Sequence, residues 1–231
     1  MINYLSLQLA GQLPKPGKTG LDWYLFYKLA KQFTNLPMLE CGTGYGGSAL
    51  TLFQLTDKLT VIDDWCQGYS QQPFEQIIEK FNLSINYIVE NTQTSIPKLS
   101  NNYLFVHLDA NKKYQALLDD LYQVDSKCDG IICVDDYMNS MWPEVTWAVD
   151  EFVKNSKWNC TLIGNHQIFI AKTHQILLTP VVDFKLAITK NSIHLTYGEF
   201  PKDNELDQFI KAGIMKYSWH DIQTLPVSDI P

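Results

Sequence analysis

Short apolar segments rich in β-branched residues alternate along this chain with segments of helical spacing. This alternation restricts the fold more than any other feature of the sequence. The expected strands begin at Met38, Lys58, Ile85, Tyr103 and Asp129, and each runs into polar residues at its end. Strands that alternate with helices build a parallel sheet with helices on both faces. We therefore expect a doubly wound, mostly parallel α/β fold, in which ligands bind beyond the carboxyl ends of the strands.

The expected helices lie before and between these strands. Residues 21–33, 112–124 and 143–155 carry apolar residues at helical spacing, and Pro143 stands where a helix accepts proline, at its first position. Residues 13–20 read LPKPGKTG, and we expect no regular element there because proline and glycine interrupt the segment.

From Trp158 onward the pattern changes to paired strands. Residues 158–172 predict an antiparallel hairpin that turns at GNH, and residues 184–198 predict a second hairpin. We assign residues 1–174 to one domain, which includes the N-terminal helix, and residues 175–231 to a C-terminal extension packed on the same domain. The extension either closes the pocket or forms a dimer contact, so a homo-oligomer is possible.

A cluster of glycines separates the first expected strand from the helix that follows it. Gly42, Gly44, Gly46 and Gly47 lack side chains that would keep a ligand from the backbone, and a helix start supplies free N–H groups. The spacing is G-x-G-x-G-G, whereas a dinucleotide site has G-x-G-x-x-G. The alternative interpretation is a tight turn with a purely structural role.

Two aspartates end the second expected strand, about 20 positions after the glycines, where an acidic residue usually binds a ribose diol. Asp63 and Asp64 occupy this place. One carboxylate accepts hydrogen bonds from both hydroxyls of a cis-diol. Either aspartate alone is also compatible with a solvated loop.

Three more carboxylates end the next two expected strands. Asp109 ends one, and Asp135 and Asp136 end the other, so all three should meet at one edge of the sheet. Clustered carboxylates repel one another unless they are protonated or share a cation. Oxygen ligands favour magnesium over zinc. The alternative is a helix cap at Asp109 and one exposed aspartate.

His107 shares a strand face with Asp109, and a second histidine would turn the pair into a non-haem iron site. His166 or His174 would have to complete it. We disfavour iron, because that chemistry usually occurs in double-sheet β folds, and His107 also fits a buried, hydrogen-bonded role.

The overall composition excludes several classes of partner. The net charge is −7 without a Lys/Arg-rich run, which argues against nucleic acid, and no long uncharged apolar span predicts a membrane segment. The five cysteines are an odd number, and no two of them form a CxxC pair, which disfavours disulfides and structural zinc. We expect a cytoplasmic protein.

The segments LECGTGYGGSA and VIDDW resemble the first two motifs of class I S-adenosylmethionine-dependent methyltransferases. Residues 103–121 and 129–152 are similar to the macrocin O-methyltransferase type, and the resemblance extends over about residues 20–172. It implies a Rossmann-like methyltransferase fold and S-adenosylmethionine as cofactor. It also implies magnesium-assisted O-methylation of a small-molecule hydroxyl of sugar or natural-product type.

The resemblance also implies which residues form the site. Magnesium would be bound by Asp109, Asp135 and Asp136 and would hold the hydroxyl oxygens of the substrate. Trp65 would border the adenine, and Tyr45 would reach the cofactor's carboxylate, although ordinary packing explains both aromatics as well. The implied cofactor-binding residues are Glu40, Gly42, Thr43, Gly44, Tyr45, Gly46, Ser48, Asp63, Asp64, Trp65, Thr92 and Asp109.

Asp109 and Lys112 are the candidates for the base that removes the acceptor's proton. Lys112 aligns with a basic position of the related metal-dependent catechol-type enzymes, and a lowered pKa beside a cation would make its amine neutral. Many macrocin-type sequences have histidine there, so the choice between the two stays open, and Lys112 also fits a surface charge.

The competing function is a sensor or scaffold that binds S-adenosylmethionine without catalysis. Carboxylates gathered at Asp109, Asp135 and Asp136 argue against it, because a scaffold has no need to concentrate charge. The glycine spacing disfavours a nicotinamide-dependent oxidoreductase.

Overall fold

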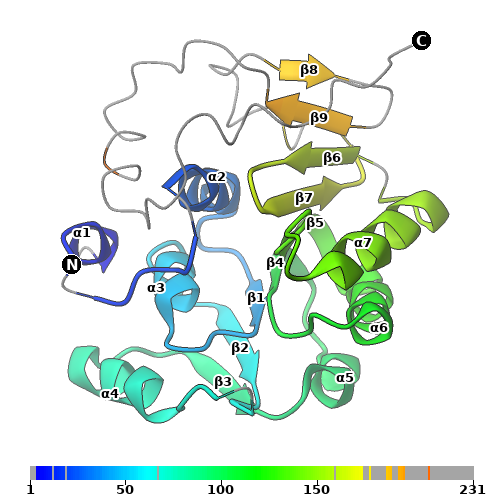
Figure 1. Cartoon of the computed structure of the whole chain (residues 1–231). Coiled ribbons are helices and arrows are strands. Elements are labelled where there is room, and N and C mark those ends of the chain that lie inside the picture. Colours follow the sequence, from blue (N-terminus) through cyan, green and yellow to red (C-terminus); the bar gives the residue numbers. More distant parts are fainter. Residues whose placement is uncertain are drawn as a thin grey trace.

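A nine-stranded sheet forms the middle layer of the structure, in the order β3-β2-β1-β4-β5-β7-β6-β9-β8 (Figure 1). The structure is a computed structural model that describes residues 4–11, 13–18, 20–66, 68–158, 160–173, 177, 186–188, 192–195 and 208. The strands are β1 Met38–Cys41, β2 Leu59–Asp63, β3 Asn86–Val89, β4 Tyr103–Leu108, β5 Cys128–Asp135, β6 Cys160–Ile163, β7 Gln167–Ala171, β8 Leu186–Ile188 and β9 Ser192–Leu195.

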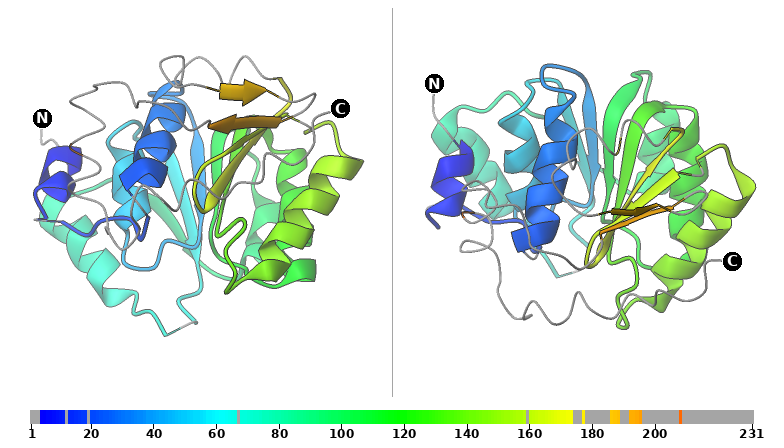
Figure 2. Two further views of the ribbon diagram at one scale, coloured as in Figure 1. Left: turned by 45° about the horizontal axis from the view of Figure 1, so that its top comes forward. Right: turned by 90° about the horizontal axis from the view of Figure 1, so that it is seen from above.

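The helices cover the two faces of the sheet. They are α1 Tyr4–Leu9, α2 Gly20–Lys31, α3 Gly47–Phe53, α4 Gln72–Phe81, α5 Thr92–Ser95, α6 Tyr114–Asp125 and α7 Pro143–Asn155, with a 3-10 turn at Ile96–Lys98. Figure 2 shows α1 to α4 on one side of the sheet and α5 to α7 on the other. The layers are those of a doubly wound α/β fold, as the alternation of segments predicts.

Strands β1 to β5 are parallel to one another, and the chain reverses the direction of winding between β1 and β4. Strand β7 then pairs antiparallel with β5 and with β6, which confirms the predicted hairpin. The second hairpin is confirmed as well, because β8 and β9 pair antiparallel. Strand β9 lies parallel to β6, so both C-terminal strands extend the same sheet.

Each face of the sheet has its own apolar core, and β4 contributes to both. Phe105 packs in the core under α2 and α3, while the next residue, Val106, packs in the core under α6 and α7. Phe26 of α2 is fully buried against Phe105, with ring centroids 5.4 Å apart. Burying one such ring stabilises the fold by about 1.5–3 kcal/mol.

The structure adds elements that the sequence did not lead us to expect. Helix α1 was not anticipated; Gln54 Oε1 accepts a hydrogen bond from the first backbone N–H of the helix, at Tyr4, at 2.7 Å. Helix α4 begins one residue before Pro73, which is a favourable place for proline. Residues 13–18 contain no helix or strand, as expected.

The division at residue 174 stays a prediction, since most of the proposed extension, and His174 itself, lie outside the described residues. Within the described part of the chain, no helix combines the length and apolarity needed to cross a membrane.

Candidate functional site

A cavity of about 480 Å³ lies at the carboxyl ends of β1 to β5, where the winding of the sheet reverses. Cavities of this size accommodate small molecules and cofactors, and this edge is where doubly wound sheets bind them. The polar strand ends therefore converge as predicted. The residues that line the cavity are Lys15, Pro16, Gly17, Gly42, Thr43, Gly44, Tyr45, Gly47, Ser48, Asp63, Asp64, Trp65, Cys66, Tyr69, Glu90, Asn91, Thr92, Asp109, Ala110, Asn111, Lys112, Asp135, Asp136 and Trp142.

The glycine turn fits tightly against other parts of the protein. Gly42 and Gly46 have φ angles of 86°, a conformation that side chains disfavour. A Cβ atom on Gly42 would lie 2.5 Å from the backbone nitrogen of Ala110, and one on Gly46 would lie 2.7 Å from the ring of Phe74. The glycines are therefore required for packing, and their contact with a cofactor stays a prediction.

Asp63 connects the end of β2 to the glycine turn. Its Oδ2 accepts hydrogen bonds from the backbone N–H groups of Thr43 at 2.7 Å and Gly44 at 2.9 Å. Its Oδ1 accepts from the N–H of Trp65 at 2.7 Å, and the Trp65 indole donates to the carbonyl of Gly44 at 2.8 Å. Both oxygens of Asp63 thus hold the backbone that forms one wall of the cavity.

Asp64 differs from its neighbour, because its side chain is exposed and lines the cavity. One of its oxygens accepts from the backbone N–H of Cys66 at 3.1 Å. A hydrogen bond with the Cys66 thiol lowers the pKa of Asp64, so the carboxylate is ionised at neutral pH. Asp64 is therefore the more available of the two acids for a ligand's hydroxyl groups.

Thr92 also lines the cavity, and a buried carboxyl group fixes its orientation. The Thr92 hydroxyl donates to Oδ2 of Asp120 at 2.9 Å. The side-chain amide of Asn111 donates to the same oxygen at 2.8 Å and to the Thr92 hydroxyl at 2.9 Å. Asp120 and Asn111 were not anticipated, because neither belongs to a recognisable motif.

Two of the predicted cofactor-binding residues lie behind the wall of the cavity. Glu40 is fully buried and accepts a hydrogen bond from the Thr43 hydroxyl at 3.4 Å. Gly46 is the N-cap of α3 and packs on Phe74. Tyr45 lies at the mouth, where its ring meets that of Tyr69 edge to face at 5.1 Å.

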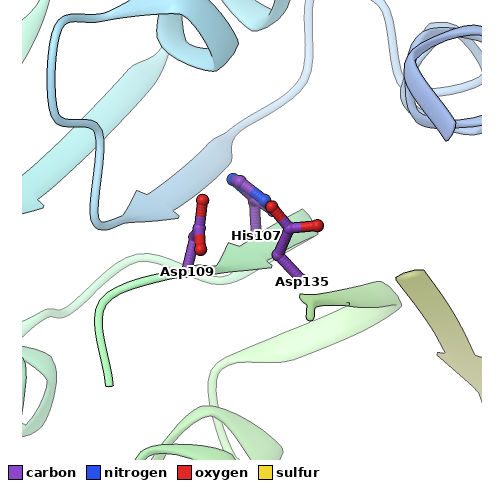
Figure 3. A group of neighbouring side chains, drawn as sticks. All are labelled: His107, Asp109 and Asp135. Carbon is purple, nitrogen blue, oxygen red and sulfur yellow. The ribbon is translucent and has the colours of Figure 1, made fainter. Parts of the chain in front are cut away.

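Asp109, Asp135 and Asp136 all line the cavity, but the group of possible metal ligands at the strand ends contains His107 and not Asp136. Figure 3 shows the side chains of His107, Asp109 and Asp135 pointing toward one another. Each has one nitrogen or oxygen atom that could bind a metal ion, and these three atoms all lie within 4.8 Å of one another. Asp136 stands outside this group, and its Oδ1 accepts from the side-chain amide of Asn139 at 2.8 Å. No second histidine joins the group within the described residues, and His174 lies outside them.

Two lysines neutralise these carboxylates. The Lys112 ammonium contacts Asp109 and donates to Oδ2 of Asp136 at 2.6 Å. The Lys18 ammonium donates to Oδ2 of Asp135 at 2.8 Å. Lys18 was not anticipated, because it belongs to the irregular segment before α2, and no signal in the sequence places that segment over β4 and β5.

The lysine contacts also fix the protonation of His107. The Lys18 Nζ lies 3.2 Å from Nε2 of His107, and an ammonium only donates, so Nε2 accepts. Nδ1 then carries the proton and faces Oε1 of Glu40 at 3.2 Å. Burial and the charge of Lys18 lower the pKa of His107, consistent with a neutral ring.

The charges around the two candidate bases differ, although the choice of base stays a prediction. Burial lowers the pKa of Lys112, but the carboxylates of Asp109, Asp136 and Asp135 outweigh burial and raise it, so this amine is protonated. Burial raises the pKa of Asp109 to about 7, although Lys112 opposes the change. Of these two candidates, Asp109 is therefore the better suited to accept a proton near neutral pH.

The same contacts test the predicted magnesium site. Magnesium requires oxygen ligands in a nearly octahedral arrangement at about 2.0–2.1 Å. Asp109 and Asp136 bond to Lys112, and Asp135 bonds to Lys18. Each of the three predicted ligands is thus already paired with an ammonium group, so the carboxylates as arranged do not fit magnesium.

The sequence matches no protein-family model and no curated protein. Several solved structures are similar to the chain. They include an rRNA methylase from Streptococcus thermophilus, with 13% identity over 64% of this chain and 93% of that one and a TM-score of 0.51. The O-methyltransferase NovP is 16% identical over 64% of this chain and 80% of its own, with a TM-score of 0.54. An O-methyltransferase from Bacillus cereus in complex with SAH is 16% identical over 73% of this chain and 89% of its own, with a TM-score of 0.52. At this identity the likeness shows that the chain shares the Rossmann-like α/β fold of these structures.

Proposed function

We propose that this protein is an S-adenosylmethionine-dependent methyltransferase that methylates a hydroxyl oxygen of a small molecule. The observation that carries the proposal is that residues suited to bind the cofactor and a residue suited to accept a proton line the same cavity wall. The glycine turn and Asp64 line this wall, and so does Asp109, whose backbone lies directly against Gly42. A methyl donor and a hydroxyl acceptor need these two surroundings side by side.

The cofactor half of the cavity has groups suited to a nucleoside. Asp64 would accept hydrogen bonds from the ribose hydroxyls, and Trp65 and Thr92 would border the base. The Asp63 carboxylate would hold the turn from behind. When bound, S-adenosylmethionine supplies a methyl group on a positively charged sulfur, which suits a wall with acidic side chains.

The acceptor half would remove a proton. Asp109 would take the proton of the acceptor's hydroxyl as the oxygen forms its bond to the methyl carbon and the carbon–sulfur bond breaks. The products are a methyl ether and a neutral thioether, and the proton on Asp109 then returns to solvent. Lys112 would bridge Asp109 and Asp136 and offset the repulsion between them, and Trp142 would border the acceptor.

The charge of the chain favours a small acceptor. One similar structure is an rRNA methylase, but this chain has a net charge of −7. Asp64, Glu90 and Asp136 line the cavity, and their carboxylates would repel phosphates. The macrocin-type resemblance of residues 129–152 supports a sugar or natural-product hydroxyl. We leave magnesium out of the proposed mechanism, because lysines already bond its candidate ligands.

Calorimetry with S-adenosylmethionine, followed by transfer of a radiolabelled methyl group to a panel of hydroxyl compounds, tests the proposal. We expect one-to-one binding and a labelled methyl ether. Binding without transfer to any acceptor would favour the sensor or scaffold alternative. A protein that does not bind the cofactor would exclude both.

A further inference from the structure

The segment before α2 is held firmly against the cavity. The side-chain amide of Gln8 donates to the carbonyl of Pro14 at 2.7 Å and to the carbonyl of Gly47 at 2.6 Å. Gly47 has no room for a side chain, because a Cβ atom there would overlap the backbone of Lys15. Residues 14–18 are therefore fixed relative to α3, and so is the origin of the Lys18 side chain.

The ammonium group of Lys18 lies among the acidic side chains at the carboxyl ends of the strands. Its side chain is 2% exposed, and the ammonium also lies 5.2 Å from the ring centre of Phe26. An ammonium is buried in this way only where charged or polar partners replace its water. Here those partners are Asp135 and His107, which belong to two neighbouring strands.

These partners are two of the three residues whose possible metal-ligand atoms lie within 4.8 Å of one another. The Lys18 Nζ bonds to Asp135 and approaches Nε2 of His107, and Lys112 bonds to the third residue, Asp109. Three carboxyl groups of the strand ends, counting Asp136, thus face two ammonium groups. Burial would raise the pKa of Asp135, but the two lysines lower it, so its carboxylate stays charged beside them.

We propose that Lys18 is a built-in counter-cation, which takes the place of a divalent metal ion between β4 and β5 and makes the site metal-independent. The inference rests on the contacts of Lys18 and holds whether or not the proposed function is correct. If the protein is a methyltransferase, its activity should survive chelators.

The proposal also predicts the effect of removing the ammonium group. In Lys18→Met the side chain keeps its length, but Nε2 of His107 and a carboxylate oxygen of Asp135 lose their donor. Together with Asp109, whose other oxygen is not the one that Lys112 contacts, they would form a site with nitrogen and oxygen ligands, which suits Mn²⁺ as well as Mg²⁺. The variant should therefore gain a metal site that the natural protein lacks.

Thermal unfolding of the full chain, with and without MgCl2 or MnCl2, measures this gain. The Tm of the natural protein should not respond to either metal. The Tm of Lys18→Met should be lower without metal and should rise by about 5 °C at ~100-fold excess of metal over its Kd. Lys98→Met, which removes an ammonium from the exposed pair with Glu90, is the matched control and should not respond.

Either of two results would overturn the proposal. One is a Tm of the natural protein that rises with Mg²⁺ or Mn²⁺, or a saturable heat of binding for either ion. The other is a folded Lys18→Met that ignores both metals. If Lys18→Met does not fold, calorimetry on the natural protein and on Lys18→Arg decides, and metal binding by either protein rejects the built-in cation. Since no assay uses S-adenosylmethionine or an acceptor, these outcomes are independent of the proposed function.

Discussion

Asp63 accepts a hydrogen bond from the backbone N–H of Gly44 at 2.9 Å, so a side chain at the end of β2 holds the turn that follows β1. The same oxygen accepts from Thr43 at 2.7 Å. Hydrogen bonds to an ionised carboxylate are stronger than neutral ones. The shape of the cavity wall therefore depends on Asp63, while Asp64 lies on the exposed side of the same wall.

This difference predicts opposite effects for two neighbouring substitutions. Asp63→Asn places an amide NH2 against backbone donors and should lower the free energy of unfolding by about 2–3 kcal/mol. Asp64→Asn should leave stability nearly unchanged and weaken binding of S-adenosylmethionine by about tenfold. Urea unfolding measures the first effect, and calorimetry measures the second. Equal loss of stability in both variants would contradict the assigned roles.

The close contact between the glycine turn and the loop after β4 predicts different losses of stability for two glycine substitutions. Gly42→Ala introduces a Cβ atom 2.5 Å from the backbone of Ala110, at a φ angle of 86°. Gly68 has a similar φ of 82° but nothing within 4 Å of the added atom. We expect Gly68→Ala to cost about 1 kcal/mol of stability and Gly42→Ala at least about 3 kcal/mol.

Both variants carry a similar backbone strain. The difference between their free energies of unfolding, measured by chemical unfolding, therefore gives the cost of the overlap between the added Cβ atom and Ala110. A Gly42→Ala protein as stable as Gly68→Ala would show that the turn relaxes away from Ala110. Loss of cofactor binding in Gly42→Ala alone would agree with displacement of the turn.

The position of Asp109 predicts the behaviour of a catalytic variant. If Asp109 accepts the acceptor's proton, Asp109→Asn should reduce kcat for methyl transfer by about 10²–10⁴. Asp136→Asn removes the other partner of Lys112 and serves as the control, with a smaller effect expected. Single-turnover rates at saturating S-adenosylmethionine separate chemistry from binding. An active Asp109→Asn together with an inactive Lys112→Met would make Lys112 the base instead.

The sheet could be predicted from the sequence because its central strands are apolar on both faces. Ile131 and Ile132 of β5 are both fully buried, on opposite sides, so the segment is recognisable without any tertiary information. Asp109 and Asp135 could be placed for a related reason. Each ends a parallel strand, and such ends meet at one edge.

The contacts of Lys18 could not be predicted in this way. The residue is 89 positions from His107 along the chain, and its segment has no periodic pattern. Only the packing of residues 14–18 on α3 brings the ammonium to the strand ends. The magnesium expectation counted the carboxylates at this edge without the contacts of Lys18 and Lys112, which only the fold reveals, and magnesium binding itself stays a prediction.

Asp120 provides the last prediction, since it is buried with one oxygen that has no hydrogen-bond partner among the described residues. Burial raises its pKa from 3.8 to about 6, despite the hydrogen bonds from Asn111 and Thr92. An acid whose pKa is raised by folding stabilises the protein when protonated, and this stability is lost as the pH rises through the folded pKa. The loss should therefore occur between about pH 4 and pH 6.

Asp120→Asn keeps a neutral group in place at every pH and still presents an oxygen to Asn111 and Thr92. The variant should be more stable than the natural protein by on the order of 2 kcal/mol at pH 7.5, with the difference disappearing toward pH 4. Urea unfolding at several pH values measures it. Asp119→Asn, at a carboxylate that accepts from Gln115, is the control, and its pH-dependent gain should be much smaller, because the charge of Asp119 is the least of the causes that raise the pKa of Asp120. A constant difference between the natural protein and Asp120→Asn from pH 4 to pH 7.5 would mean that Asp120 stays ionised in the folded protein, held by Thr92 and Asn111 alone.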